Sequence, residues 1–226
     1  YPDIWKLIQK RPARNLSGVT IITVLTSPTP DGQSFSCKHN CYYCPNEPAH
    51  EGNNWTPQPR SYLYSEPAVL RANRNKFEAD LQTFDRLKSL LICGHKCDKL
   101  EFILEGGTFT EYPKKYLNRY FRDFIYTCNN FFEIIKYGFG SPQLVKRKTF
   151  EQEITINKNA RCKIIGICIE TRPDAILLHD EDGIPWIQTL LNWGVTRLQL
   201  GVQHIDNDIL KKINRGHNVE KVIEAI

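Results

Sequence analysis

Short apolar segments of strand length alternate with longer segments of helical spacing along most of this 226-residue chain. β-branched runs bounded by Gly or Pro predict strands, and apolar residues three and four apart predict helices. Strands that alternate with helices form parallel βαβ units, and four or five such units fit here. The predicted fold class is therefore α/β, as a partial (β/α) barrel. The expected strands are 20–26, 100–105, 132–136, 163–170 and 196–201, and the expected helices are 67–92, 113–124, 186–193, 219–226 and one that begins at Pro142.

Three of the eight cysteines lie within eight residues, just after the first predicted strand and a Pro- and Ser-rich loop. Cys37 and Cys41 are separated by three residues, and Cys41 and Cys44 by two. Thiolates are the ligands of iron–sulfur clusters, and closely spaced cysteines on one loop can wrap a cubane. Three protein ligands leave the fourth iron open to a small molecule. We therefore interpret these cysteines as the ligands of a [4Fe–4S] cluster.

Two other interpretations of the cysteines stay open at this stage. Structural zinc sites use four ligands, usually as two separated pairs, so His39 would have to complete the site or Cys93 and Cys97 would have to supply a second pair. Disulfides are typical of secreted proteins, and the chain has no signal-peptide pattern. The cysteines outside the loop are expected to be small buried hydrophobes: Cys93, Cys97, Cys128, Cys162 and Cys168.

Glycines and polar residues follow the predicted strands. Gly106 and Gly107 close one strand, Glu170 and Arg172 follow another, and Gln203 follows the last. Active sites of β/α barrels collect at the carboxyl ends of the strands, and glycine lets the backbone approach a ligand closely. Each motif alone also fits a structural role: a turn for the glycines, and a cap or salt bridge for the charged pair.

The cysteine spacing, with Tyr43 just before the last cysteine, resembles the radical S-adenosylmethionine (SAM) signature. Six segments, in order, are similar to the catalytic subunit of Elongator and its relatives, a tRNA uridine-modifying, Elongator-like acetyltransferase family. The resemblance runs from about Lys10 to the end, although the cysteine loop is shorter than is usual there, which indicates a divergent or compact branch. The segments are Ser17-Gly18, the cysteine loop with Pro45, and residues 98–109, 169–174, 200–203 and 214–217.

This resemblance implies a [4Fe–4S] cluster and SAM as cofactors. In radical SAM enzymes the free iron binds the amino and carboxylate groups of SAM, and one electron from the cluster cleaves SAM to methionine and a 5′-deoxyadenosyl radical. No residue is assigned a catalytic role. The cofactor-binding residues implied are Tyr43, Gly106, Gly107, Thr108, Glu170, Arg172 and Gln203.

The implied function is carboxymethyl-type modification of carbon 5 of the wobble uridine in tRNA. Acetyl-CoA would be the co-substrate, with a radical formed on its acetyl group, and the anticodon region of tRNA and other Elongator-type subunits would be partners. Two alternatives remain, because a fold does not fix a substrate. One is a radical SAM enzyme that acts on another substrate, and the other is a non-catalytic, metal-stabilised RNA-binding module.

We expect residues 1–18 to be a linker from the end of a tRNA-binding region and residues 19–226 to be the radical SAM core. The chain has no Met and stops within a predicted helix, which indicates a piece of a longer protein, and no segment resembles an acetyltransferase domain. A net charge of +5 is compatible with a polyanionic partner. No apolar run is long enough to cross a membrane, so we expect a cytoplasmic or nuclear protein.

Aromatic and basic residues are interleaved just past the cysteine loop, at Arg60, Tyr62 and Tyr64. Such interleaving is typical of surfaces that stack on RNA bases and bind phosphates. Packing beneath the cysteine loop is the competing interpretation.

Overall fold

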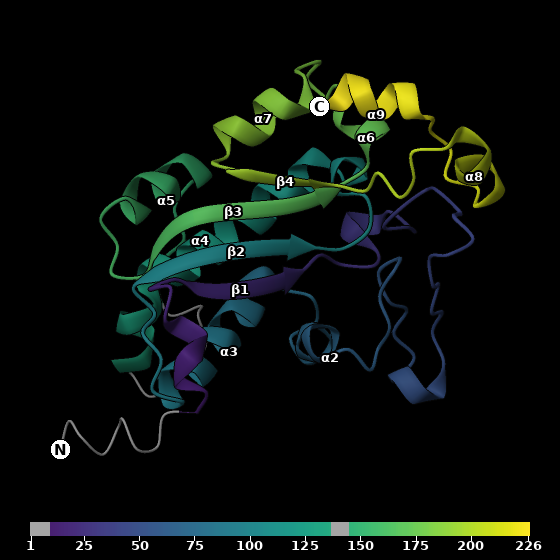
Figure 1. The fold of residues 1–226 in the computed structure, drawn as a ribbon. Coiled ribbons are helices and arrows are strands. Elements are labelled where there is room, and N and C mark those ends of the chain that lie inside the picture. Colours follow the sequence, from purple (N-terminus) through teal and green to yellow (C-terminus); the bar gives the residue numbers. More distant parts are fainter. Residues whose placement is uncertain (1–9, 137–144) are drawn as a thin grey trace.

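The computed structural model describes residues 10–136 and 145–226. Within them, four parallel strands form one sheet in the order β1-β2-β3-β4, and they run over Thr20–Leu25, Lys99–Glu105, Lys163–Thr171 and Arg197–Leu200. The sheet curves and stays open, and its strands all point toward the same edge (Figure 1). A partial (β/α) barrel is therefore confirmed.

Helices α2 to α7 (residues 67–192) lie between successive strands along the chain, as the alternating pattern requires, and α8 and α9 (residues 207–225) follow the last strand. In the described part of the chain, none of them combines the length and the apolar character that spanning a membrane requires. The α-helices are α2 (Pro67–Arg74), α3 (Ala79–Ile92), α4 (Lys114–Lys136), α5 (Phe150–Asn157), α6 (Pro173–Ile176), α7 (Trp186–Asn192), α8 (Asn207–Lys212) and α9 (Val219–Ala225), and 3-10 turns cover Pro12–Asn15, Pro30–Gly32, Glu51–Asn53 and Phe109–Glu111.

Aromatic side chains fill the core between the sheet and the helices behind it. Phe102 of β2 stacks on Phe124 of α4, with ring centroids 4.6 Å apart. Phe121 of α4 also contacts Trp193, which follows α7, at 5.1 Å. Alternate residues of β2 enter this core, namely Leu100, Phe102 and Leu104, whereas Glu101 and Glu105 point to the open inner face of the sheet.

Two element predictions were wrong. Residues 132–136 continue α4 instead of forming a strand, because the buried side chains of Phe124, Phe131 and Ile134 keep the helical spacing across the locally β-prone sequence. The single helix expected over 67–92 is two helices.

The break between these helices has a local cause. The side chain of Asn75 donates to the carbonyl of Arg71 and closes α2. Lys76 and Phe77 then take left-handed backbone conformations with φ of 52° and 57°. This reversal returns Phe77 to a small apolar cluster with Leu25 and Val69, which stabilises the bend. The helix expected from Pro142 begins outside the described residues, and the described helix in that region, α5, starts at Phe150 behind a Thr149 cap.

The side chain of Gln82 on α3 pairs with backbone groups on the outer edge of β1 that do not bond to β2. Its fully buried amide accepts from the Leu25 amide at 3.0 Å and donates to the Leu25 carbonyl at 2.8 Å. Leu25 is fully buried, so without Gln82 both backbone groups would lose these hydrogen bonds in a place that water does not reach.

Replacing Gln82 with Ala is expected to lower the free energy of unfolding by about 2–4 kcal/mol, since each buried polar group left unpaired costs about 1–3 kcal/mol. Urea unfolding measures this difference. The control is Ser89→Ala, at an exposed position of the same helix, which should change stability by at most about 0.5 kcal/mol. Equal effects of the two changes would contradict this role for Gln82.

Candidate functional site

The cysteine loop lies over the carboxyl ends of the strands, where it forms one wall of a cavity of about 300 Å³. Cys37, Cys41 and Cys44 all line this cavity. The sheet supplies the opposite wall, so residues that are far apart in the sequence meet there. Every residue predicted to bind a cofactor lies on the cavity surface: Tyr43, Gly106, Gly107, Thr108, Glu170, Arg172 and Gln203.

The glycine pair after β2 makes room for the protein itself. A Cβ atom on Gly106 would lie 1.8 Å from Oγ1 of Thr26, and one on Gly107 would lie 1.9 Å from the carbonyl oxygen of Ser36. The Thr108 amide donates to that same Ser36 carbonyl at 3.0 Å. Gly107 therefore lets the start of the cysteine loop pack directly on the end of β2. The sequence indicates only a turn or a ligand contact at this glycine.

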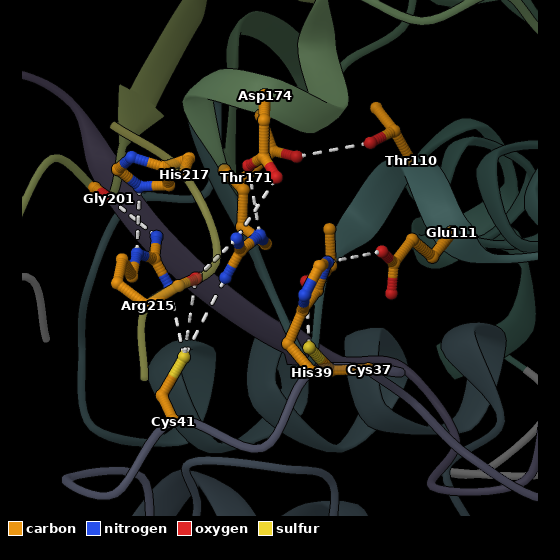
Figure 2. Close-up of polar contacts among 12 residues, drawn as sticks. Cys37, His39, Cys41, Thr110, Glu111, Thr171, Asp174, Gly201, Arg215 and His217 are labelled. Atoms are coloured by element: carbon orange, nitrogen blue, oxygen red, sulfur yellow. Dashed lines mark hydrogen bonds and ion pairs between the residues drawn. The ribbon is translucent and has the colours of Figure 1, made fainter. Parts of the chain in front are cut away.

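Side chains that follow β2 hold the first half of the loop. Sγ of Cys37 lies 3.0 Å from Oγ1 of Thr108. Glu111, whose side chain is buried, accepts from the Lys38 amide at 3.0 Å and contacts Nε2 of His39 at 3.1 Å (Figure 2). These contacts fix the backbone next to the first cysteine.

Cys41 lies against two buried guanidinium groups. Nη1 of Arg172 and Nη1 of Arg215 each lie 3.7 Å from its Sγ (Figure 2). Arg172 follows β3, and Arg215 comes from the turn between α8 and α9. Burial alone would raise the pKa of Cys41, but the hydrogen bond and charge of Arg215, with Tyr43 and Arg172, outweigh burial and hold that pKa below its ordinary value. The site therefore favours the thiolate at this cysteine.

Residues 60–62, which follow the cysteine loop in the sequence, contact the loop and the inner face of the sheet. Sγ of Cys44 accepts from the Ser61 hydroxyl at 3.0 Å, and Nη2 of Arg60 donates to Oδ1 of Asn40 at 2.7 Å. The Tyr62 hydroxyl donates to Oε2 of Glu170 at 3.2 Å inside the open barrel. Arg60 and Tyr62 are therefore engaged within the fold, which favours packing beneath the loop over an RNA-stacking surface.

Two carboxylates occupy neighbouring strand ends on the inner face of the sheet. Glu105 ends β2, and Glu170 lies near the end of β3. Burial raises the pKa of Glu105 to about 7, with a further contribution from the negative charges of Glu170 and Glu66, while Arg71 opposes the shift. Glu170 lines the cavity and Glu105 lies beside it on the neighbouring strand, so carboxylates lie at the strand ends, whereas guanidinium groups lie beside Cys41.

The arrangement bears on the other interpretations of the cysteines. All eight are free, and the described residues contain no group of three or more His, Cys, Asp or Glu side chains that could hold a single metal ion. His39 is held by Glu111. Cys97 lies just before the amino end of β2, a full strand away from Thr108 and Cys37. Cys97, Cys128, Cys162 and Cys168 are buried as expected, but Cys93 is only half-buried at the end of α3.

Two residues of the site were missed from the sequence. Arg215 lies in a short basic segment that reads as a loop between helices, and Glu111 lies in a turn with no motif of its own. Arg215 could have been identified from the resemblance, because residues 214–217 are one of the six segments that are similar to the family. Arg172 was found, but its guanidinium contacts Cys41 and pairs with Asp174 at 3.0 Å.

Replacing Glu105 with Gln is expected to stabilise the protein at pH 8 and to have little effect at pH 5. An acid whose pKa is raised in the folded state contributes stability below its unfolded pKa, and this contribution is lost as the pH rises through the folded value of about 7. Thermal unfolding of both proteins at the two pH values measures the difference. The control is Glu151→Gln at an exposed position of α5. A Glu105→Gln effect that does not change with pH would contradict the shifted pKa.

The chain is similar to known proteins over most of its length. The chain is 36% identical over 216 residues to a tRNA uridine(34) acetyltransferase of Dehalococcoides mccartyi. The aligned region covers 96% of this chain and 40% of the relative. It is 32% identical over 223 residues to the human Elongator complex protein 3, and the aligned region covers 96% of this chain and 36% of that protein. The chain thus spans less than half the length of these relatives.

A solved structure shares the fold as well. The archaeal Methanocaldococcus infernus Elp3 with an N-terminal deletion (residues 1–46) superposes with a TM-score of 0.62 at 28% identity, over 92% of this chain and 34% of that one. The family model of the radical SAM superfamily matches residues 34–226, which include the cysteine loop and β2 to β4. With the cysteines and the strand ends gathered around one cavity, this match shows that the chain belongs to the radical SAM superfamily.

Proposed function

We propose that this chain is the radical SAM core of an enzyme that modifies carbon 5 of the wobble uridine in tRNA. The observation that carries the proposal is the single cavity that joins three cysteines to the ends of the parallel strands. Membership in the superfamily implies a [4Fe–4S] cluster and SAM, and the tRNA uridine is proposed because a relative is a tRNA uridine(34) acetyltransferase.

The donors around the cavity fit these cofactors. Cys37, Cys41 and Cys44 would hold the cluster, since thiolates are its protein ligands, and the guanidinium groups beside Cys41 suit an anionic ligand set. A volume of about 300 Å³ is at the lower end of the range for small-molecule sites. SAM would lie against the strand ends, at Gly106, Gly107, Thr108, Glu170 and Gln203, beside Tyr43 and Arg172.

Bound together, the cluster and SAM supply a carbon radical that abstracts hydrogen. The chain itself orients the reacting groups and excludes water. The amides of Gly107 and Thr108 are held from behind, by the Tyr112 hydroxyl at 2.8 Å and the Ser36 carbonyl at 3.0 Å. The wall against which SAM would lie is therefore held by hydrogen bonds within the protein itself.

The rest of the reaction extends beyond the matched region. We propose acetyl-CoA as the co-substrate, with its acetyl group as the site of the radical, and the anticodon region of tRNA as the acceptor. Residues 1–18 would belong to the end of a tRNA-binding region and residues 19–226 to the radical core. Parts of the relatives that lie outside the similarity would contribute to binding acetyl-CoA and tRNA, and other Elongator-type subunits are the protein partners. We propose a cytoplasmic location, with the nucleus as the alternative compartment.

The first test is anaerobic reconstitution with iron and sulfide, followed by SAM under reducing conditions. We expect about four irons per chain and formation of 5′-deoxyadenosine. Both should be lost in the Cys37→Ala, Cys41→Ala, Cys44→Ala triple variant and kept in the Cys93→Ala control. Zinc in place of iron, or a cluster without SAM cleavage, would favour the non-catalytic RNA-binding module.

A second assay separates the substrates. Transcribed tRNA is incubated with and without acetyl-CoA, and its nucleosides are separated by mass. A modified uridine that depends on both SAM and acetyl-CoA supports the proposal. SAM cleavage without modified uridine, in a protein extended to the length of the relatives, would favour a radical SAM enzyme that acts on another substrate.

The Gly107→Ala variant tests how the cysteine loop is seated. The added methyl group cannot fit at 1.9 Å from the Ser36 carbonyl, so the loop must move away from β2. We expect iron incorporation to fall at least several-fold while circular dichroism stays unchanged. In the control, Gly166→Ala on β3, the nearest atom is the flexible side chain of Glu101 at 3.3 Å. Equal iron content in the two variants would show that the contact is dispensable.

A further inference from the structure

The turn between α8 and α9 clamps the middle of the cysteine loop. Nδ2 of Asn214 donates to the Asn40 carbonyl at 2.7 Å, and the Tyr42 amide donates to the Ile213 carbonyl at 3.0 Å. Nη1 of Arg215 reaches Sγ of Cys41 between these two backbone contacts. Three consecutive loop positions are thus held by a segment that lies 174 residues later in the chain.

The two arginines at Cys41 differ in their counter-ions. Arg172 pairs with Asp174 through Nε and Nη2, at 3.0 Å each. Arg215, only 5% exposed, donates to neutral acceptors, namely Nε2 of His217 at 2.9 Å and the carbonyl of Gly201 at 2.5 Å. In the part of the chain that the structure describes, no carboxylate forms an ion pair with Arg215.

A buried guanidinium without a counter-ion is strongly unfavourable. Among the described side chains that contact Arg215, Cys41 is the one that would bring negative charge to it, as a thiolate ligand of the cluster. His217 accepts a hydrogen bond from Nε of Arg215 and so orients the guanidinium. Burial and the charge of Arg215 lower the pKa of His217, which keeps the imidazole neutral and able to accept.

The other two cysteines have neutral partners. Cys37 contacts the hydroxyl of Thr108, and Cys44 accepts from the hydroxyl of Ser61, each at 3.0 Å. The positive charge is therefore concentrated at the middle ligand. Hydrogen bonds and positive charge at a cluster sulfur favour the more negative, reduced state and so raise the reduction potential.

We propose that Arg215 is a positioning residue that holds the Cys41 thiolate and, together with Arg172, raises the reduction potential of the bound cluster, while His217 orients its guanidinium. This inference rests on the cluster of the proposed function. It assigns the 213–217 turn two separable tasks: a backbone clamp through Ile213 and Asn214, and a charge through Arg215.

The test is an EPR-monitored redox titration of the anaerobically reconstituted chain before SAM is added. Arg215→Met keeps the length of the side chain and removes its charge. At a fixed potential we expect at least a tenfold lower ratio of reduced to oxidised cluster, which is a shift of about 59 mV to more negative values for a one-electron couple. Arg215→Lys keeps the charge and should shift the ratio less. Iron content is measured in every sample.

Two further variants separate charge from structure. Asn214→Ala removes the clamp and leaves the guanidinium, so its midpoint potential should stay close to that of the wild type. His217→Gln should shift the potential in the same direction as Arg215→Met, by a smaller amount.

The outcomes distinguish the two levels of the proposal. A wild-type chain that binds no cluster refutes the proposed function. A loaded Arg215→Met protein with the wild-type potential refutes only the role of Arg215. If Arg215→Met fails to fold or to bind iron, the His217→Gln protein decides. A wild-type potential in that protein would likewise overturn the inference.

Discussion

The contact between the start of the cysteine loop and the end of β2 is the constraint on which the site depends. The absence of a side chain at Gly107 lets the Ser36 carbonyl approach closely enough to accept from the Thr108 amide. Once that contact forms, Cys37 lies beside the hydroxyl of Thr108, and Glu111 can reach the backbone of the loop. The strand end itself is held by the buried sheet and the aromatic core. Packing that stabilises β2 therefore also determines where the first cysteine lies.

The middle of the loop depends on a different part of the chain. Cys41 is placed by Arg172, which follows β3, and by Arg215, whose turn also binds Asn40. The carbonyl of Arg215 accepts from Arg172 at 2.6 Å, which ties these two supports together. The cysteine loop forms little regular structure, so its conformation comes from contacts with several separate segments of the chain. A short sequence motif thus becomes a defined site only when the sheet and the last helices are in place.

Sequence reasoning succeeded where local pattern and topology determine the outcome. The strand before Gly106 has one apolar face, and parallel strands share one carboxyl edge, so Glu170, Arg172 and Gln203 were predicted to lie at a common site, and they line one cavity. Sequence reasoning failed where contacts between residues far apart in the sequence determine the local structure. Residues 132–136 favour a strand locally, but their side chains complete the buried stripe of α4. The contact of Arg215 with Cys41 joins residues 174 positions apart, and no local pattern encodes it.

The charges around the cavity are divided between its two sides. Guanidinium groups lie at Cys41, whereas Glu105 and Glu170 lie at the strand ends, with the hydroxyl of Tyr62 on Glu170. An iron–sulfur cluster with three thiolate ligands is anionic, and SAM carries a positive sulfonium, so each ligand of the proposed function would meet the opposite charge. Both carboxylates come from the inner face of the open sheet, where Glu105 is partly buried and Glu170 accepts from the Tyr62 hydroxyl. Because the barrel is open, a parallel sheet, normally apolar on both faces, presents carboxylates on the side that faces the cysteine loop.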